Sequence, residues 1–292
     1  MVSTQKSPKG SLFIDSVISS HLEKLDYPEK SIWSMKNCGL NIGSQHIIKK
    51  CGCGINLIPL NHHCSLRTCP DCSKLRKRRI RDKFLPFMKS LPRNRLHDIY
   101  FLTISPKNYA NLEKGMEHLR KSFSKFVRLK YINERILGGL AVIETKQTDE
   151  KGWNLHLHAI IYSRRLDMKI RREFEDSKIV SLWKKSSKRD VYMRINKLNT
   201  LDYTLNYVLK YVSANKDDFS SPKNFARYIV ATRKRKLLIR FGMFFKFKPV
   251  KKPHVCSCCM QIIEFIYDLE IVGMMKEAEA REKERPPDLG DY

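Results

Sequence analysis

Two histidines in the segment NLHLHAIIY, residues 154–162, are the first residues of this 292-residue chain whose type and spacing suggest chemistry. The alternation of polar and apolar residues predicts a strand with His156 and His158 on one face and an aliphatic row on the other. Imidazoles at alternate strand positions are close enough to share one cation, so the pair predicts a metal platform. The alternative interpretation is a pair of structural histidines.

Three tyrosines in the segment TLDYTLNYVLKYVSA, residues 200–214, form a second pattern. At 100° per residue, the leucines and valines of this predicted helix occupy one side. The opposite side carries Tyr203, Tyr207, Tyr211 and Lys210. Tyrosines of an ordinary core would share the aliphatic side, so the pattern predicts a helix that presents phenols and a lysine opposite its packed face. The alternative is that the tyrosines are half-buried against a neighbouring element.

Cysteines gather near the start of the chain, in CGCGINLIPLNHHCSLRTCPDC at residues 51–72. Thiolates on two short turns can close a tetrahedral, structural zinc site. We expect Cys69 and Cys72 to be ligands, together with Cys64 and either Cys53 or Cys51. The alternative is that these cysteines are reduced and fill a small core.

A second group near the end of the chain consists of His254, Cys256, Cys258 and Cys259 in the segment PHVCSCCMQ. Adjacent cysteines rarely bind the same ion, so the spacing leaves three alternatives open. The group forms a separate metal site, contributes to the N-terminal site, or consists of plain thiols.

The charge of the chain indicates a polyanionic partner. Its 57 Lys and Arg residues against 30 Asp and Glu residues give a formal net charge of +27. Nucleic acid is the partner that this excess favours, ahead of an anionic membrane surface or a merely solvated basic surface. Two basic stretches are candidate DNA contacts. The residues concerned are Arg76, Lys77, Arg78, Arg79, Arg233, Lys234 and Arg235.

The remaining pattern predicts an α+β fold. Strands are expected at 98–105, 138–145, 154–162 and 191–196, and helices at 111–132, 168–185 and 200–214. This order predicts a central antiparallel sheet with helices on one face. We expect four regions: residues 1–50 without a clear motif, a zinc-binding segment with a basic helix at 51–95, a catalytic domain at 96–248, and a cysteine cluster with a charged tail at 249–292. The chain lacks a membrane-length apolar run and a secretory signal, so we expect a soluble, cytoplasmic protein.

Three motifs in order, FLTIS at 101–105, HLH at 156–158 and YVLKY at 207–211, resemble those of the HUH endonucleases. The chain is most similar to the two-tyrosine rolling-circle replication initiators of small plasmids and single-stranded DNA phages. The resemblance covers roughly residues 51–245, and the cysteine segment upstream is also similar to that of many plasmid members. Members often carry another histidine two residues before the pair, where this chain has Asn154.

The resemblance implies a fold similar to RNA-recognition and ferredoxin-like domains, and a catalytic Mg²⁺ or Mn²⁺ ion held by His156 and His158. Glu144 is the candidate third ligand, provided that the register of the hairpin places it on the histidine face. By the same resemblance, Tyr211 or Tyr207 attacks single-stranded origin DNA and forms a 5′-phosphotyrosine and a free 3′-OH, and the strand is rejoined later. Lys210 is then placed to position phosphate.

Two other functions fit part of the pattern. A two-tyrosine transposase uses the same chemistry, and a non-catalytic zinc-containing regulator explains the charge and the cysteines but not the histidine pair. No P-loop sequence is present, so replication would require a host helicase as well as a polymerase.

Overall fold

The computed structural model describes residues 14–40, 46–147, 152–166, 177–198, 200–249 and 253–266. The chain divides into two compact units, and each of its two sheets lies within one of them. The predicted region 51–95 is shared between the units, because the chain passes from the smaller to the larger unit between His63 and Cys64. The predicted charged tail lies outside the described residues.

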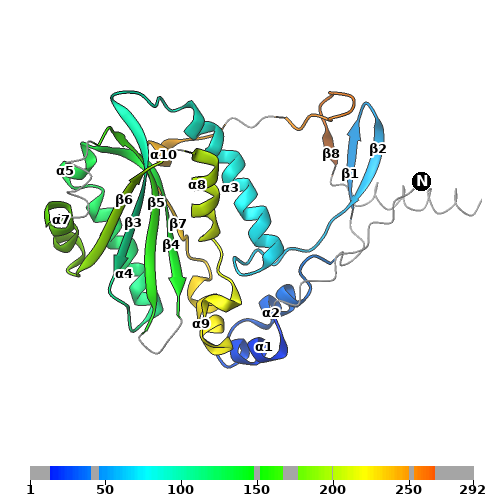
Figure 1. Cartoon of the computed structure of the whole chain (residues 1–292). Coiled ribbons are helices and arrows are strands. Elements are labelled where there is room, and N and C mark those ends of the chain that lie inside the picture. Colours follow the sequence, from blue (N-terminus) through cyan, green and yellow to red (C-terminus); the bar gives the residue numbers. More distant parts are fainter. Residues whose placement is uncertain are drawn as a thin grey trace, which may run out of the picture. The chain divides into compact units, whose positions relative to one another are not determined.

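The larger unit is built on a five-stranded antiparallel sheet (Figure 1). Its strands, in the order β6-β3-β5-β4-β7, come from segments far apart in the sequence. Their bounds are β3 His97–Pro106, β4 Ile136–Lys146, β5 Asn154–Arg164, β6 Val191–Lys197 and β7 Leu238–Gly242. The sheet confirms the four predicted strands and adds β7, which the sequence analysis did not predict.

One face of this sheet carries the main hydrophobic core. In β5, alternate residues from Leu155 to Ile161 are fully buried there, as the sequence pattern predicts. The longer helices that contribute to this core include α1 Ser16–Glu23, α4 Leu112–Phe126, α7 Ser177–Ser187 and α9 Pro222–Thr232. The predicted apolar side of α4 is confirmed, since its residues from Leu112 to Phe126 at helical spacing are buried.

The opposite face of the sheet is also covered, so the prediction of helices on one face only is wrong. A second core joins strand residues such as Val142 and Ile160 to helices on that side (Figure 1). These helices are α3 Pro70–Ser90, α8 Leu201–Lys210 and α10 Met243–Lys246. These helices cover the part of the sheet face bearing His156 and His158 where β4 and β5 carry aliphatic side chains. Those side chains are buried only if a second layer of helices packs on this face.

Shorter helices complete the larger unit. These are α2 Glu29–Lys36, α5 Lys130–Asn133 and the 3₁₀ turn η2 Lys216–Asp218. The helix predicted over 111–132 is interrupted after Phe126, where the chain turns before it enters α5. Of the helix predicted over 168–185, the first part lies outside the described residues, and α7 accounts for the rest.

The smaller unit contains a three-stranded antiparallel sheet in the order β2-β1-β8. Its strands are β1 His46–Cys51, β2 Gly54–Pro59 and β8 Glu264–Ile266. Strand β8 follows the second cysteine group and pairs with β1, so segments about two hundred residues apart meet in one sheet. Throughout the described ranges, no helix is both long enough and apolar enough to cross a membrane.

Candidate active site

The hairpin of β4 and β5 places a carboxylate beside the two histidines. Glu144 pairs directly opposite His156, so both side chains leave the same face of the sheet. The Nε2 atom of His158 lies 2.7 Å from a Glu144 carboxylate oxygen, and the Nδ1 atom of His156 lies 3.9 Å from the same oxygen. One ligand atom from each residue lies within 4.8 Å of the other two. The three residues can therefore hold a metal ion.

The charges at this site suit a divalent cation. Burial disfavours ionisation of Glu144, but its hydrogen bonds with His158 and Lys146 outweigh this effect and hold the pKa of the carboxyl below its ordinary value. Burial lowers the pKa of His156, although Glu144 partly opposes the shift. The site thus combines an ionised carboxylate with an imidazole that stays neutral at pH 7, and these are the protonation states that bind metal.

Strand β3 supports the same histidine from the other side. Thr103 pairs opposite His158, and its hydroxyl lies 3.4 Å from the Nδ1 atom of that ring. Phe101 stacks on the His158 ring, with centroids 5.7 Å apart and planes 9° apart. Both residues belong to the motif FLTIS, to which the sequence analysis gave no individual roles. The pairing of β3 with β5 is what brings this motif to the histidines.

Helix α8 brings the tyrosines to the metal site. Its aliphatic side, including Leu205 and Val208, is buried in the second core as predicted. Tyr211, the C-cap residue of the helix, stacks on His158 with centroids 4.3 Å apart and planes 18° apart. Tyr207 meets Tyr211 edge to face at 5.2 Å. The tyrosine side of the helix is thus turned away from its aliphatic side, and the alternative of tyrosines half-buried against a neighbouring element holds for Tyr211, which is partly buried and packs against the second core.

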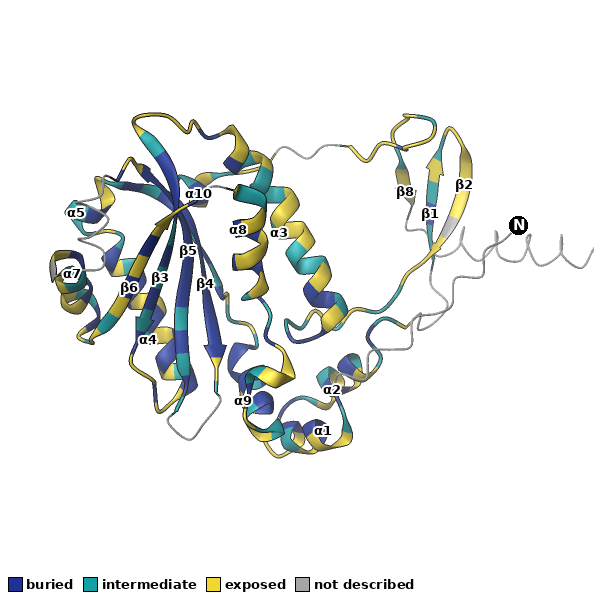
Figure 2. Cartoon of the chain, in the orientation of Figure 1, coloured by how far each residue is buried: buried dark blue, intermediate teal, exposed yellow. Residues whose placement is uncertain are grey.

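Exposure falls along the tyrosine row toward the metal site. Tyr203 is 72% exposed and Tyr207 39% exposed, whereas Tyr211 is partly buried. Figure 2 shows the alternation of buried and exposed residues along α8. Burial, a hydrogen bond with Tyr207 and the negative charge of Glu144 all raise the pKa of Tyr211 well above its ordinary value. Its phenol is therefore protonated at neutral pH until a cation acts on it.

A pocket lies beside these groups and is lined by basic side chains. Three lysines border it together with Glu144 and Tyr211: Lys77 from α3, Lys146 from β4 and Lys210 from α8. The sequence analysis selected Lys77 and Lys210 but missed Lys146, whose Nζ lies 3.1 Å from Glu144. Strand alternation alone could not predict that Lys146 lies at this site, because the residues next to it are set by the pairing of β4 with β5. The pocket can bind an anion next to the metal ligands.

The other predicted DNA contacts fall into two groups. Arg76 lines a second pocket together with Arg233, Lys234 and Arg235, so two basic stretches far apart in the sequence converge. Arg67, which the sequence analysis did not select, belongs to the same pocket, and burial lowers its pKa to about 10. Arg78 and Arg79 instead face solvent on α3, where Arg78 forms an exposed ion pair with Asp82.

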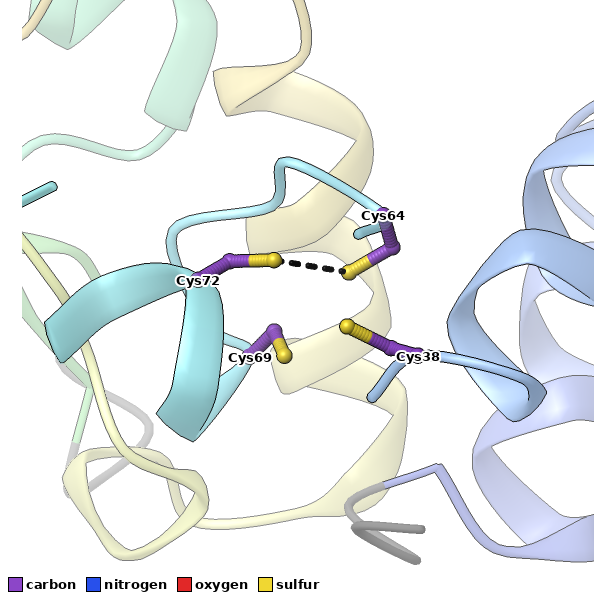
Figure 3. A group of neighbouring side chains, drawn as sticks. All are labelled: Cys38, Cys64, Cys69 and Cys72. Carbon is purple, nitrogen blue, oxygen red and sulfur yellow. Dashed lines mark hydrogen bonds between the residues drawn. The ribbon is translucent and has the colours of Figure 1, made fainter. Parts of the chain in front are cut away.

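The first cysteine group lies where α3 begins. The Sγ atoms of Cys64, Cys69 and Cys72 point toward one another, and the backbone N–H of Ser65 donates to the Sγ of Cys72 at 3.2 Å (Figure 3). Hydrogen bonds with Cys69 and Cys72, burial and the negative charge of Cys69 all favour the protonated thiol and raise the pKa of Cys64. A divalent cation would stabilise the thiolates in place of the protons, and the close approach of the sulfur atoms fits a structural metal.

The fourth thiol of this group is that of Cys38, which completes a set of four Sγ atoms within 4.8 Å of one another (Figure 3). The expectation that Cys51 or Cys53 fills this position is therefore wrong. Those two cysteines belong to a second set, with Cys256 and Cys259. Cys38 has no neighbouring cysteine or histidine in the sequence, so spacing alone could not identify it.

Together these features define a class of protein: an antiparallel sheet that carries two histidines and a carboxylate, faced by a helix of tyrosines and surrounded by basic side chains. A sequence model of the family described as replication protein matches residues 58–253, and the chain belongs to that family. The matched residues include the candidate metal ligands Glu144, His156 and His158, the three tyrosines of the row and α3. No curated protein and no solved structure matches the chain.

Proposed function

We propose that this protein initiates DNA replication by nicking single-stranded DNA at an origin, through attack of a tyrosine on a phosphodiester. The observation that carries the proposal is the contact of Tyr211 with His158, inside a group of three residues that can hold a metal ion. Membership of the replication protein family supports initiation over transposition. The nucleophile and the metal ligands come from three different elements, and their convergence supports catalysis over DNA binding alone.

In the proposed step, the phenolic oxygen of Tyr211 bonds to the phosphorus of the scissile phosphate, and the bond from phosphorus to the 3′-oxygen breaks. The phenol proton goes to solvent, and the departing 3′-oxygen takes up a proton to become a 3′-OH. The products are a 5′-phosphotyrosine and a free 3′-end that a polymerase can extend. The covalent bond keeps the phosphoryl group activated, so a later attack by a 3′-OH can rejoin the strand without ATP.

Glu144, His156 and His158 would hold Mg²⁺ or Mn²⁺, which offsets negative charge on the phosphate in the transition state. Stacking on His158 orients the ring of Tyr211 beside this position. The raised pKa of Tyr211 makes it a weak nucleophile by itself, so a nearby cation is required to favour the phenolate. Lys77, Lys146 and Lys210 would hold the flanking phosphates in the pocket.

Tyr207 would act as the second nucleophile. It lies one helical turn before Tyr211 and touches its ring, so both phenols are within the same site. With two tyrosines, one can keep a DNA end while the other attacks again, as the end of a replication round requires. Tyr203, which is more exposed and stacks on Tyr207, is proposed to contact bases.

We also propose that the cysteine set at the start of α3 binds a structural zinc ion. Four thiols that lie close together suit Zn²⁺ better than Mg²⁺ or Mn²⁺, which prefer oxygen ligands. This ion would fix the first turn of α3, the helix that supplies Arg76 and Lys77 to the two basic pockets.

The direct test is to trap the covalent intermediate. Labelled single-stranded origin DNA incubated with the protein and Mn²⁺ should give an adduct that survives denaturing electrophoresis and disappears with EDTA. The double variant Tyr207→Phe, Tyr211→Phe should give no adduct, whereas Tyr203→Phe, altered on the same helix face, should give the wild-type amount. An undiminished adduct in the double variant would refute the mechanism, and DNA binding without any adduct would favour a non-catalytic regulator.

A further inference from the structure

The smaller unit contains a second set of four thiols that the proposed function does not use. The Sγ atoms of Cys51, Cys53, Cys256 and Cys259 all lie within 4.8 Å of one another, and those of Cys53 and Cys256 are 3.8 Å apart. The pairs are separated by about two hundred residues of sequence but meet because β8 pairs with β1. We propose that these four cysteines bind one structural zinc ion, distinct from the set that contains Cys64.

The first pair of ligands lies on a tight hairpin turn. Cys51 is the last residue of β1 and pairs with Gly54 at the start of β2, so only Gly52 and Cys53 form the loop. The φ angle of Gly54 is +118°, a conformation that L side chains rarely adopt. The turn therefore brings the thiols of Cys51 and Cys53, which are separated by one residue, to the same end of the hairpin. This is the C-x-C arrangement of a short metal-binding turn.

The second pair lies on another tight turn, just before β8. The backbone N–H of Met260 donates to the carbonyl of Cys256 at 2.9 Å, and the N–H of Cys256 donates to the carbonyl of Gln261 at 2.8 Å. Met260 has a φ angle of +57°, which closes the turn. Cys256 and Cys259 thus form a C-x₂-C turn whose shape is set by its own backbone hydrogen bonds. This separates the roles of the adjacent Cys258 and Cys259, which sequence spacing alone could not do.

Backbone amides point at these sulfur atoms. The N–H groups of Cys258 and Cys259 donate to the Sγ of Cys256, and the N–H of Gln261 donates to the Sγ of Cys259. On the hairpin, the N–H of Cys53 also favours the thiolate of Cys51, although burial and contacts with Cys256 and Cys259 outweigh it and raise the pKa of Cys51. Such hydrogen bonds stabilise thiolates, the form in which cysteine binds zinc. Four thiols without acidic or histidine partners in the set favour Zn²⁺ over the oxygen-seeking Mg²⁺ and Mn²⁺.

Among the residues that the structure describes, few apolar side chains stabilise the three-stranded sheet. Of the side chains described on β1, β2 and β8, only Ile48 is buried. Apolar side chains on these strands, such as Ile55 and Phe265, are exposed instead. A sheet that buries so little apolar surface needs a cross-link to be stable. A zinc ion bound by both turns would fasten β8 to the β1–β2 hairpin.

Zinc stoichiometry tests the proposal directly. The full chain, purified with reductant and dialysed to remove weakly bound metal, is assayed by elemental analysis. We expect Cys256→Ser to contain one zinc ion fewer per chain than the wild type. Cys258→Ser is the matched control, because this exposed residue lies in the same turn but outside the set. It should keep the wild-type content. Equal zinc in the wild type and Cys256→Ser, or equal loss in both variants, would overturn the proposal.

A second measurement does not depend on zinc retention. When Co²⁺ replaces zinc, cobalt bound to thiolates gives a charge-transfer absorption band. The intensity of this band should fall in Cys256→Ser by roughly the contribution of one site, and should be unchanged in Cys258→Ser. Alkylation with iodoacetamide in denaturant, without reductant, measures how many of the cysteines are free thiols. All four should be alkylated once zinc is removed. Resistance of these cysteines to alkylation would show disulfides in place of a metal site and would also overturn the proposal. Neither readout depends on nicking, so failure of the proposed function leaves this test intact.

Discussion

The ring of Tyr211 lies flat against the ring of His158, with centroids 4.3 Å apart and planes 18° apart. His158 in turn contacts Glu144, with its Nε2 atom 2.7 Å from the carboxylate. The C-terminal end of helix α8 thus packs on the histidine face of the sheet through a contact with His158, which is also a candidate metal ligand. Changes in either partner should therefore affect both the position of the tyrosine and the binding of metal.

Single substitutions should distinguish the roles of Tyr211 and Tyr207 in the two cleavage steps. Tyr211→Phe should reduce the first nick by about 10³-fold or more, because the variant lacks the nucleophile but keeps the ring that stacks on His158. Tyr207→Phe should keep the first nick within about tenfold and lose the second transfer of a DNA end. Single-turnover nicking of a labelled oligonucleotide, followed by addition of a second oligonucleotide, measures both steps. A Tyr211→Phe protein that nicks at the wild-type rate would assign the first attack to another residue.

Glu144→Gln should weaken metal binding without unfolding the site. The amide keeps the shape of the side chain but removes the charge, so the Mn²⁺ concentration for half-maximal nicking should rise by roughly 10- to 100-fold. Saturating Mn²⁺ should restore part of the rate. Glu117→Gln is a suitable control, because Glu117 is an exposed residue of α4 that pairs with Lys121. If both variants show the wild-type metal dependence, Glu144 is not a ligand.

Lys77 should contribute to DNA affinity through phosphate contacts. Burial lowers its pKa, and nearby Lys210 adds to the shift, which indicates that positive charge is concentrated at the pocket. Lys77→Gln should weaken single-stranded DNA binding and reduce the slope of log affinity against log salt by about 0.7 for one lost contact. Fluorescence anisotropy, recorded at several salt concentrations between about 50 and 200 mM, measures this slope. Lys114→Gln on α4 should leave it unchanged.

Asp98 should make stability depend on pH. Burial opposes its ionisation, but hydrogen bonds from Lys197, the N–H of Ile99 and Arg93 outweigh burial, so its pKa in the folded protein is below the ordinary value. Its contribution is therefore complete above the unfolded-state pKa of about 4 and is lost as the pH falls through the folded-state pKa. Asp98→Asn should lower the free energy of unfolding at pH 7 by about 1–3 kcal/mol, and the difference should shrink at lower pH.

Urea unfolding at pH 7 and at about pH 3 compares the two conditions. Asp82→Asn is the control, because the ion pair of Asp82 with Arg78 on α3 is exposed and its loss should change stability little at either pH. An Asp98→Asn protein that is as stable as the wild type at pH 7 would contradict the role given to this residue.

Local sequence patterns were enough to predict four of the five strands of the larger sheet, the buried row from Leu155 to Ile161 and the aliphatic side of α8. They also predicted which side of that helix carries Tyr207 and Tyr211. These features follow from periods of two and 3.6 residues, which depend only on neighbours along the chain. The excess of basic residues likewise needs no structure to indicate a polyanionic partner.

Only the tertiary structure decided how separate segments meet. Strand register placed Glu144 opposite His156, since a shift of one residue would have turned its side chain to the other face. The second core beneath α3 and α8 depends on packing that no single segment reveals. The cysteines divided into two sets that spacing could not separate, with Cys38 in one and Cys51 in the other. Residues that can share a metal ion need only be close in space, so the membership of each set was fixed by the path of the folded chain and not by the order of the cysteines in the sequence.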